Sequence, residues 1–340
     1  MLGTAQRSGD AARRKDDDQA LGERAGLGGL RRDALTPATV DIPFHDYLEA
    51  KFALDERSLN REVQTEFAQW LSGKPRSTCL DLGTGTGASV LRLLKLAPET
   101  DLHITAVDRD RTLLDTARER TAGLLRNGGS DVSAQPTGIR ARQDGREIAV
   151  DFVCSDLRHF EPNKAPGSYD AVIAHAVMDL LPLRTMAGRI ARWLRPRGIF
   201  YGTINYDGET ALFPVYADAE FENRILAVYD ASMEKRRVWD ENSGGARSGR
   251  RLHRVLGETG FEPIAYGSSD WNITPLRRIY RNRDAVCLAA LLNMIRDEAL
   301  RSGQFSTDSL DRWYRERSER LTAGELGLII HQIDLLAEKV

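Results

Sequence analysis

The sequence is poor in cysteine, and its few cysteines form no metal-binding pattern. Cys79, Cys154 and Cys287 are the three cysteines among 340 residues, and they lie far apart along the chain. Metal-binding cysteines usually occur at short, regular spacings, so this arrangement argues against a metal site. An odd number of scattered cysteines is typical of proteins in a reducing compartment.

The sequence also lacks an excess of charge of one sign and any long apolar run. Lys and Arg number 48 against 50 Asp and Glu, whereas proteins that bind duplex nucleic acid usually carry a basic excess. This balance argues against nucleic acid as a partner, although a local basic face stays open. No run of 18 apolar residues is present to span a membrane, and Met1–Asp10 lacks the apolar stretch of a signal peptide. We therefore expect a cytoplasmic protein with no membrane partner.

The first forty residues differ in composition from the rest. Residues 1–40 are rich in Arg, Asp, Gly and Ala and have almost no aromatic or β-branched side chains. Such a segment buries too little apolar area to offset the entropy lost on ordering, so we expect it to be disordered. Residues 41–76 carry apolar side chains at helical spacing, ended by Gly73 and Pro75, and predict an N-terminal helical lid.

Strand-like and helix-like segments alternate over residues 77–205. Short apolar runs suited to strands are separated by amphipathic segments suited to helices, which is the pattern of βαβ units. The strands are expected at 77–82, 103–107, 148–154, 169–174 and 199–204, and the helices at 88–96, 110–126 and 184–194. Asp144-Gly145 marks a tight hairpin turn before the third strand. We predict an α/β fold with a doubly wound, mostly parallel sheet.

Two long segments do not continue this alternation. Residues 206–250 and about 275–322 are polar and partly helical. Long insertions of this kind in α/β enzymes are usually functional, so we expect both to cover the ligand edge of the sheet. Residues 251–340 would supply the last part of the sheet around the second insertion.

A glycine-rich loop leaves the first predicted strand and opens the first helix of the core. Its sequence is Asp81-Leu82-Gly83-Thr84-Gly85-Thr86-Gly87. Glycines at alternate positions let the backbone turn tightly and approach a ligand closely. In a doubly wound sheet this turn lies at the carboxyl ends of the strands, where ligands bind. The loop also fits a dinucleotide-binding pattern, because Gly83, Gly85 and Ala88 match G-x-G-x-x-A.

Three carboxylates stand near the ends of three successive predicted strands. Asp81 lies just before the loop, where it would repel a pyrophosphate and favour a cationic ligand. Asp108 ends the second strand, where a carboxylate can accept hydrogen bonds from ribose hydroxyls. Asp156 follows the third strand and suits the amino group of adenine, with Leu157 packed on the ring. Each aspartate alone has a structural alternative, because strand-end aspartates often cap the next helix.

Together these motifs resemble those of class I S-adenosylmethionine-dependent methyltransferases. The resemblance covers the family's first three motifs, its fourth strand with the loop beside the sulfonium, and the turn before its fifth strand, at residues 78–87, 106–108, 153–157, 169–181 and 194–201. It implies S-adenosyl-L-methionine as the cofactor and a Rossmann-like, seven-stranded sheet closed by two antiparallel strands. Phe261–Tyr266 and Leu326–Leu336 are the expected closing strands, with a helix as the alternative for the second.

The same resemblance implies which residues bind the cofactor. They are Asp81, Gly83, Thr84, Gly85, Gly87, Asp108, Arg109, Asp156, Leu157 and His175. Polar residues of the predicted lid, such as Tyr47 and Lys51, lie where related enzymes cover the cofactor.

Catalytic residues are predicted after the fourth strand. His175 is the candidate general base, because its unperturbed pKa lies near neutrality, and a cofactor-contacting or purely structural histidine is the alternative. Asp179, four residues on, would orient His175 or contact the acceptor, with a helix-start carboxylate as the alternative.

Acceptor-binding residues are predicted in the later segments. Asn205 and Tyr206 follow the fifth strand and should face the site. Arg247 and Arg250 precede a helix, where guanidinium groups could clamp an anionic acceptor through two hydrogen bonds each. A solvated basic loop is the alternative.

The function predicted from these residues is methyl transfer to a small molecule. The sequence after the fourth strand lacks Asp or Asn followed by Pro-Pro and an aromatic residue, which disfavours adenine or cytosine as targets. Three alternatives stay open: a methyltransferase acting on RNA or protein, an NAD(P)-dependent oxidoreductase, and a cofactor-binding protein that transfers no methyl group. A homodimer is also compatible with the sequence.

Overall fold

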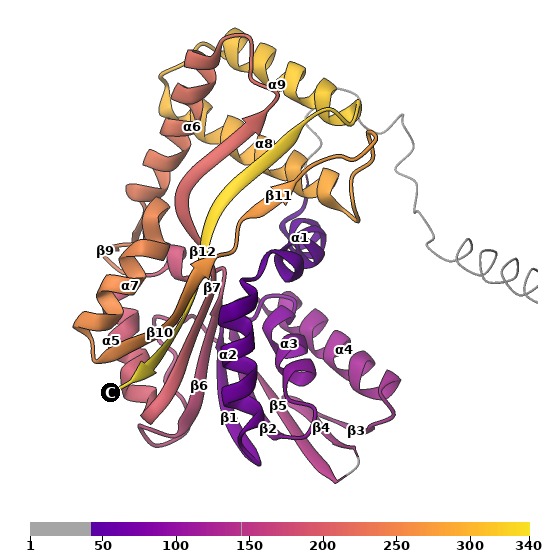
Figure 1. The fold of residues 1–340 in the computed structure, drawn as a ribbon, viewed down its shortest axis with the longest axis vertical. Helices are drawn as coiled ribbons and strands as arrows, with labels where there is room; N and C mark the ends of the chain where they lie inside the picture. Colours follow the sequence, from indigo (N-terminus) through magenta and orange to yellow (C-terminus); the bar gives the residue numbers. More distant parts are fainter. Residues whose placement is uncertain (1–41, 144) are drawn as a thin grey trace, which may run out of the picture. The chain divides into compact units, whose positions relative to one another are not determined.

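The computed structural model describes residues 42–143 and 145–340 (Figure 1). The segment predicted to be disordered, residues 1–40, lies outside the described residues, as does Asp144 of the predicted hairpin turn. The strands on either side of that turn do form an antiparallel hairpin, since Gln143 pairs with Arg146.

Seven strands form the centre of the sheet. In spatial order they are β5 (Arg146–Cys154), β2 (Asp101–Asp108), β1 (Arg76–Leu82), β6 (Tyr169–His175), β7 (Leu194–Phe213), β12 (Gly327–Lys339) and β10 (Phe261–Ser268). The first five run parallel, whereas β12 is antiparallel to both of its neighbours. This order confirms the Rossmann-like sheet, and it confirms a strand at the C-terminal end of the chain, where a helix was the alternative.

Three further strands enlarge the sheet to ten. They are β3 (Asp131–Gln135) and β4 (Gly138–Gln143) beyond β5, and β11 (Trp271–Ile273), which pairs with β12. The sequence did not predict β3, because all five of its side chains are at least partly exposed and its composition is that of a polar loop. Its pairing with β4 supplies the backbone hydrogen bonds that stabilise it.

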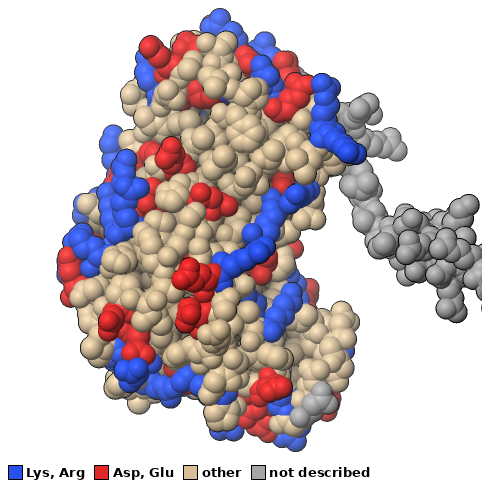
Figure 2. All heavy atoms as spheres, in the orientation of Figure 1, with Lys and Arg blue, Asp and Glu red and all other residues tan. Residues whose placement is uncertain are grey.

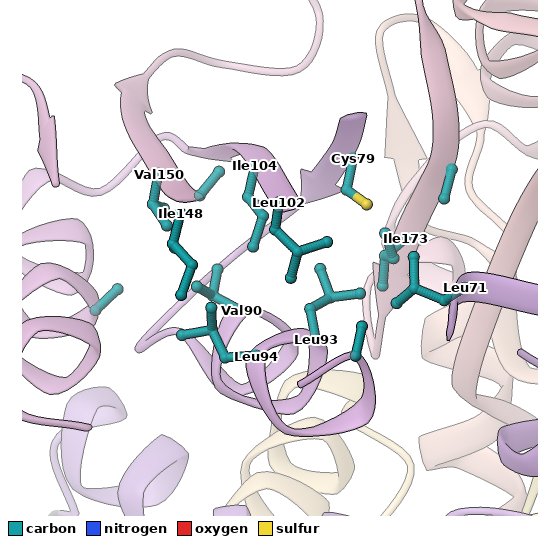
Figure 3. Packing of buried hydrophobic residues seen from close by; sticks show 14 of the residues in the cluster. Leu71, Cys79, Val90, Leu93, Leu94, Leu102, Ile104, Ile148, Val150 and Ile173 are labelled. Carbon is teal, nitrogen blue, oxygen red and sulfur yellow. The ribbon is translucent and has the colours of Figure 1, made fainter. Parts of the chain in front are cut away.

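Helices cover both faces of the sheet, and each face has its own apolar core. On one face lie α2 (Arg61–Ser72), α3 (Ala88–Leu96) and α4 (Arg111–Asn127), and on the other lie α5 (Leu183–Trp193) and α7 (Ser248–Glu258). Figure 3 shows the first core, in which Val90 and Leu94 of α3 face Ile104 and Ile148 of the sheet. These helices hold the carboxyl ends of β1 and β2, and the loops after them, in fixed positions.

A second layer of structure extends beyond the core along β7 and β12. The fifth strand, predicted to end at residue 204, runs on to Phe213, because β12 pairs with it as far as Gly327. The helices α6 (Ala219–Glu234), α8 (Asp284–Ser302) and α9 (Thr307–Thr322) pack together on this extension, which forms the upper lobe in Figure 1. The helical content expected of residues 206–250 and 275–322 therefore lies in this lobe.

The N-terminal segment forms two helices, although its apolar spacing predicts one. The first, α1 (Phe44–Ser58), ends before Asn60, and α2 begins just after it. The Asn60 side chain accepts a hydrogen bond from the Val63 N–H (3.1 Å) and so caps α2, while its own N–H donates to the Asp334 carboxylate (2.8 Å). The break turns α1 away from α2, so that α1 lies over the carboxyl edge of the sheet.

A buried ion pair joins two helices of the upper lobe. Arg317 of α9 is fully buried and donates two hydrogen bonds to the Glu222 carboxylate of α6, at 2.7 and 2.6 Å. The Trp313 indole donates to the same carboxylate at 2.8 Å. Because a buried charge without a partner is costly, the two helices depend on both members of the pair.

We predict that Arg317→Met lowers the free energy of unfolding by about 3–5 kcal/mol, because it leaves Glu222 buried and unpaired. The double variant Arg317→Met/Glu222→Gln should recover most of that loss, since no charge then remains in the interior. Arg320→Met, which removes an exposed pair with Glu316 on the same helix, should cost less than about 0.5 kcal/mol. Urea unfolding of the three variants checks this, and equal losses in the single and double variants would contradict it.

Candidate active site

The glycine-rich loop has a backbone that only glycine adopts easily. Gly83, Gly85 and Gly87 have φ values of 66°, 53° and 91°. A Cβ atom at Gly83 would lie 2.8 Å from the Cγ2 atom of Val177, closer than side-chain atoms approach one another. The loop therefore packs directly against the segment after β6 and presents its backbone at the carboxyl end of the sheet.

Asp81 lies beneath this loop and is fully buried. Its Oδ2 atom accepts a hydrogen bond from the Thr84 hydroxyl at 2.6 Å, which holds the loop to the strand. Its Oδ1 atom has no hydrogen-bond partner among the described residues. Burial raises the pKa of Asp81 to about 7, so a cationic group near Oδ1 would favour its charged form.

Asp108 and Asp156 lie on one cleft together with the glycine loop. Asp108 accepts hydrogen bonds from the Gly85 N–H (2.8 Å) and the Asp110 N–H (2.9 Å). Asp110, not Asp108, caps α4 through its own side chain, so the capping alternative for Asp108 does not hold. Asp156 accepts from the Arg158 N–H at 2.7 Å. Each carboxylate keeps acceptor capacity for a ligand in the cleft.

The cleft has a volume of about 640 Å³, within the usual range for small-molecule sites. Its floor contains nine of the sequence-predicted cofactor residues or their direct neighbours: Gly83, Thr84, Gly85, Thr86, Asp108, Arg109, Asp156, Leu157 and His175. Its cover comes from α1 on one side and from the segment Arg236–Trp239 on the other. This second segment lies within residues 206–250, the insertion expected to cover the ligand edge, although sequence reasoning did not single out its individual residues.

His175 is held by hydrogen bonds at both ring nitrogens. Its Nδ1 atom lies 2.8 Å from the Thr203 hydroxyl, and its Nε2 atom lies 3.1 Å from Oδ2 of Asp55. Burial, together with the charge of Arg92, lowers the pKa of His175 to about 4, so the ring is neutral near pH 7. A neutral imidazole with both nitrogens engaged has no free lone pair to accept a proton from a substrate. This geometry supports a structural role for His175 rather than the predicted role of general base.

Asp55 is the group that orients His175, and sequence reasoning did not single it out. Its Oδ2 atom also accepts from the Lys51 ammonium at 2.6 Å, and its Oδ1 atom accepts from the Trp271 indole at 2.9 Å. These partners hold the pKa of Asp55 at about 2 despite its burial. The signal in the sequence was a Lys and an Asp four residues apart inside an apolar helix.

Asp179 does not contact His175, contrary to one of its two predicted roles. It lies in the short 3-10 helix Met178–Leu180, whose flanking residues line the cleft. Burial raises the pKa of Asp179 to about 6, while the positive charges of Arg236 and Lys51 oppose that rise. The charges of Asp179 and Arg236 therefore attract each other at the edge of the cleft.

The four predicted acceptor-binding residues do not line this cleft. The Asn205 amide donates to the Ile333 carbonyl (2.9 Å), and the Tyr206 hydroxyl donates to Asp230 (2.6 Å). Arg250 binds the buried Asp207 carboxylate at 2.7 Å, and Arg247 is exposed at the start of α7. β7 continues past residue 204, so the residues that follow lie in the extension paired with β12 rather than in a loop at the carboxyl edge of the core.

The described residues contain neither a metal-binding cluster nor a membrane-spanning helix. In the part of the chain that the structure describes, no group of three His, Cys, Asp or Glu side chains could hold a metal ion. Among the same residues, no helix is both long and apolar enough to cross a membrane.

Comparison with known proteins relates part of this cleft to a known family. Residues 80–202 match the family model described as a methyltransferase domain. The chain is 29% identical to a tRNA1(Val) (adenine(37)-N6)-methyltransferase of Phocaeicola vulgatus, over 41% of this chain and 56% of that protein. It is 33% identical to a 2-phytyl-1,4-naphtoquinone methyltransferase of Nostoc sp., over 23% of this chain and 32% of that protein. The chain thus spans about half or less of the curated relatives it matches.

Solved structures of low sequence identity are similar over most of the chain. A geranyl diphosphate C-methyltransferase from Streptomyces coelicolor A3(2) is 14% identical, with a TM-score of 0.40 over 90% of each chain.

The family match, which includes the loop after Asp81 and the motifs at Asp108 and Asp156, confirms the resemblance to class I methyltransferases. It likewise confirms S-adenosyl-L-methionine as the cofactor.

We predict that Asp108→Ala weakens binding of S-adenosylhomocysteine by about 1–3 kcal/mol, because buried hydrogen-bonding groups lose their acceptor. Asp218→Ala serves as the matched control: it removes the cap of α6, which costs about 1 kcal/mol of stability, but it lies outside the cleft and should leave affinity unchanged. Calorimetric titration together with thermal unfolding separates the two effects. Equal affinity in wild type and Asp108→Ala would exclude Asp108 from the cofactor site.

A second prediction concerns pH. Burial lowers the pKa of His175 in the folded protein below that of a free histidine, so the unfolded state binds a proton more readily as pH falls. Between pH 7 and pH 5 this histidine should lower the free energy of unfolding by about 2 kcal/mol. His175→Gln should therefore lose stability at pH 7 but show a flatter decline toward pH 5. Denaturant unfolding of both proteins at the two pH values checks this, and parallel declines would contradict it.

Proposed function

We propose that this protein, whose residues 80–202 form a methyltransferase domain, transfers the methyl group of S-adenosylmethionine to a small anionic acceptor. One observation carries the proposal. A single cleft of about 640 Å³ holds the glycine loop, Asp108 and Asp156 on its floor, and the cationic side chains of Lys51 and Arg236 in its cover.

The floor of the cleft fits the cofactor in three respects. The backbone of the glycine loop is open to a close approach, and Asp108 and Asp156 offer acceptors for ribose hydroxyls and the adenine amino group. Asp81 lies buried beneath the loop, where a cationic ligand in the cleft would favour its charged form. When bound, the cofactor supplies a methyl group on a sulfonium whose leaving group is a neutral thioether, so the protein has mainly to align the acceptor and exclude water.

The cover of the cleft favours an anionic acceptor. The Lys51 ammonium already pairs with Asp55, whereas the Arg236 side chain makes no hydrogen bond or ion pair with any other described residue. A guanidinium group binds carboxylate and phosphate groups through two parallel hydrogen bonds. Arg236 therefore takes the role that the sequence had suggested for Arg247 and Arg250.

An anionic acceptor also fits the lack of a free base. His175 has both nitrogens engaged, and Asp179 does not line the cleft. An acceptor atom that is already ionised, such as a carboxylate oxygen, needs no proton removed before it attacks the methyl group. In this proposal His175 and Asp55 hold the cover in position, and the positive charge of Arg236 favours the charged form of Asp179.

The size of the site and the surface charge favour a small molecule over a macromolecule. Figure 2 shows acidic and basic side chains interspersed over the face in view, without a continuous basic track. A nucleic-acid substrate would be expected to need such a track. Both α1 and the segment Arg236–Trp239 bound the cleft, which leaves a recess suited to a compact acceptor.

The test is transfer of a labelled methyl group from S-adenosylmethionine to separate panels of carboxylates, phosphate-bearing metabolites, neutral small molecules, RNA and proteins. We expect label on an anionic small molecule. Label confined to RNA or protein would overturn the acceptor class, and preferential binding of NAD over S-adenosylmethionine would overturn the activity.

With an acceptor in hand, Arg236→Gln should raise its KM by about 10- to 100-fold, the loss expected when a charged hydrogen-bond donor is removed. Affinity for S-adenosylhomocysteine should not change. Arg250→Gln is the matched control, because Arg250 pairs with Asp207 outside the cleft and its removal should leave KM as it was. Equal KM values in wild type and Arg236→Gln would exclude Arg236 from the acceptor site.

A further inference from the structure

A small hairpin over the cleft is built on an unfavourable turn. Its strands are β8 (Arg237–Val238) and β9 (Glu241–Asn242), and we call residues 237–242 the strap. The two turn residues, Trp239 and Asp240, have φ values of 57° and 66°. Two-residue turns with positive φ at both positions strongly favour Asn-Gly or Asp-Gly, and a bulky residue in this conformation is rare.

The strap keeps this conformation because its neighbours hold it from several sides. The Arg237 guanidinium donates to the Asp240 carbonyl across the turn. The Thr185 hydroxyl at the start of α5 donates to the Glu241 carboxylate at 2.8 Å. Just after the strap, the Gly244 N–H donates to the Leu181 carbonyl at 2.9 Å. Strained residues that the surrounding structure holds in place occur mainly at functional sites.

The residue that this turn presents is a tryptophan on the wall of the cleft. Trp239 lines the cleft together with Asp156 and Leu157. It packs against the apolar cluster that contains Leu157, and its ring lies 6.0 Å from the guanidinium of Arg189. Arg189 in turn donates a hydrogen bond to the Leu157 carbonyl, so Trp239 and Leu157 share one neighbour.

We propose that the strap is a cofactor clamp, in which Trp239 contacts the adenine ring of S-adenosylmethionine from the side opposite the glycine loop. The proposal rests on the methyltransferase function proposed above, because Asp156 and Leu157 mark the adenine end of the cleft in that assignment. An indole offers a flat π-face that suits a purine, and base–aromatic contacts contribute substantially to nucleotide binding. The strained turn is then the means by which the chain points this side chain into the cleft.

The two turn residues provide a matched pair of variants. Trp239→Gly and Asp240→Gly each replace a residue at positive φ with the residue that tolerates it, so both relieve the same kind of strain. Only Trp239→Gly removes the proposed contact, because the Asp240 side chain is almost fully exposed and its one ion pair, with Arg158, is long at 3.7 Å. Neither residue belongs to the acceptor machinery.

Calorimetric titration with S-adenosylhomocysteine and with adenosine tests the clamp. We expect Trp239→Gly to weaken binding of both ligands by roughly tenfold or more, since both carry the adenine, and Asp240→Gly to bind as tightly as wild type. In addition, S-adenosylhomocysteine should change the intrinsic tryptophan fluorescence of wild type, and most of that change should be lost in Trp239→Phe. Thermal unfolding establishes that each variant is folded.

Three results would overturn the clamp. Equal affinity of Trp239→Gly and Asp240→Gly for both ligands would show that the indole makes no contact. A fluorescence change that persists in Trp239→Phe would place the responsive tryptophan elsewhere. Failure of the wild-type protein to bind S-adenosylhomocysteine would overturn the proposed function and the clamp together, whereas the first two results leave the proposed function standing.

Discussion

The Asp55 carboxylate is the interaction on which the geometry of the cleft depends. It is buried in α1 and accepts hydrogen bonds from Lys51 of the same helix, from His175 at the end of β6 and from Trp271 of β11. These three partners belong to the cover, to the core sheet and to the strand that leads into the upper lobe. An ionised carboxylate in the interior is tolerable only when several donors satisfy it, and the low pKa of Asp55 reflects that they do. One charge thus joins three separate parts of the chain around the cleft.

The two halves of the cover are held by different physical means. Buried polar contacts hold α1 in place: Asp55 at its centre and, just beyond its end, the Asn60 N–H bound to Asp334 of β12. The strap is held by contacts at its edges, and its turn keeps two residues in a backbone conformation that they rarely adopt. A cover made of two separate segments above a floor formed by the core sheet suits a site that must admit a cofactor and then exclude water.

Much of the core could be predicted because its signals are local. The alternation of strand and helix patterns follows from the periods of the two structures, and the glycines after Asp81 are required by a turn that the residues themselves display. Strand-end carboxylates at positions 108 and 156 lie on one cleft because parallel strands place their carboxyl ends at the same edge. The errors arose where the existence or the length of a strand depends on the strand paired with it. β3 is stabilised by its pairing with β4 rather than by its composition, and β7 continues because β12 pairs with it.

Local patterns in the sequence predicted the strands and helices of the core and most of the residues on the cleft floor, because these depend on neighbouring residues or on the fixed topology of a parallel sheet. The cofactor followed from the resemblance of the motifs to those of class I methyltransferases. Tertiary structure alone decided the cover and the residues that face the acceptor. Asp55 meets His175 across 120 positions of the chain, and Arg250 turns to Asp207 instead of a ligand because the extended β7 brings that carboxylate to it. Spacing along a sequence carries no information about such pairings, since they are set by which surfaces pack together when the chain is folded.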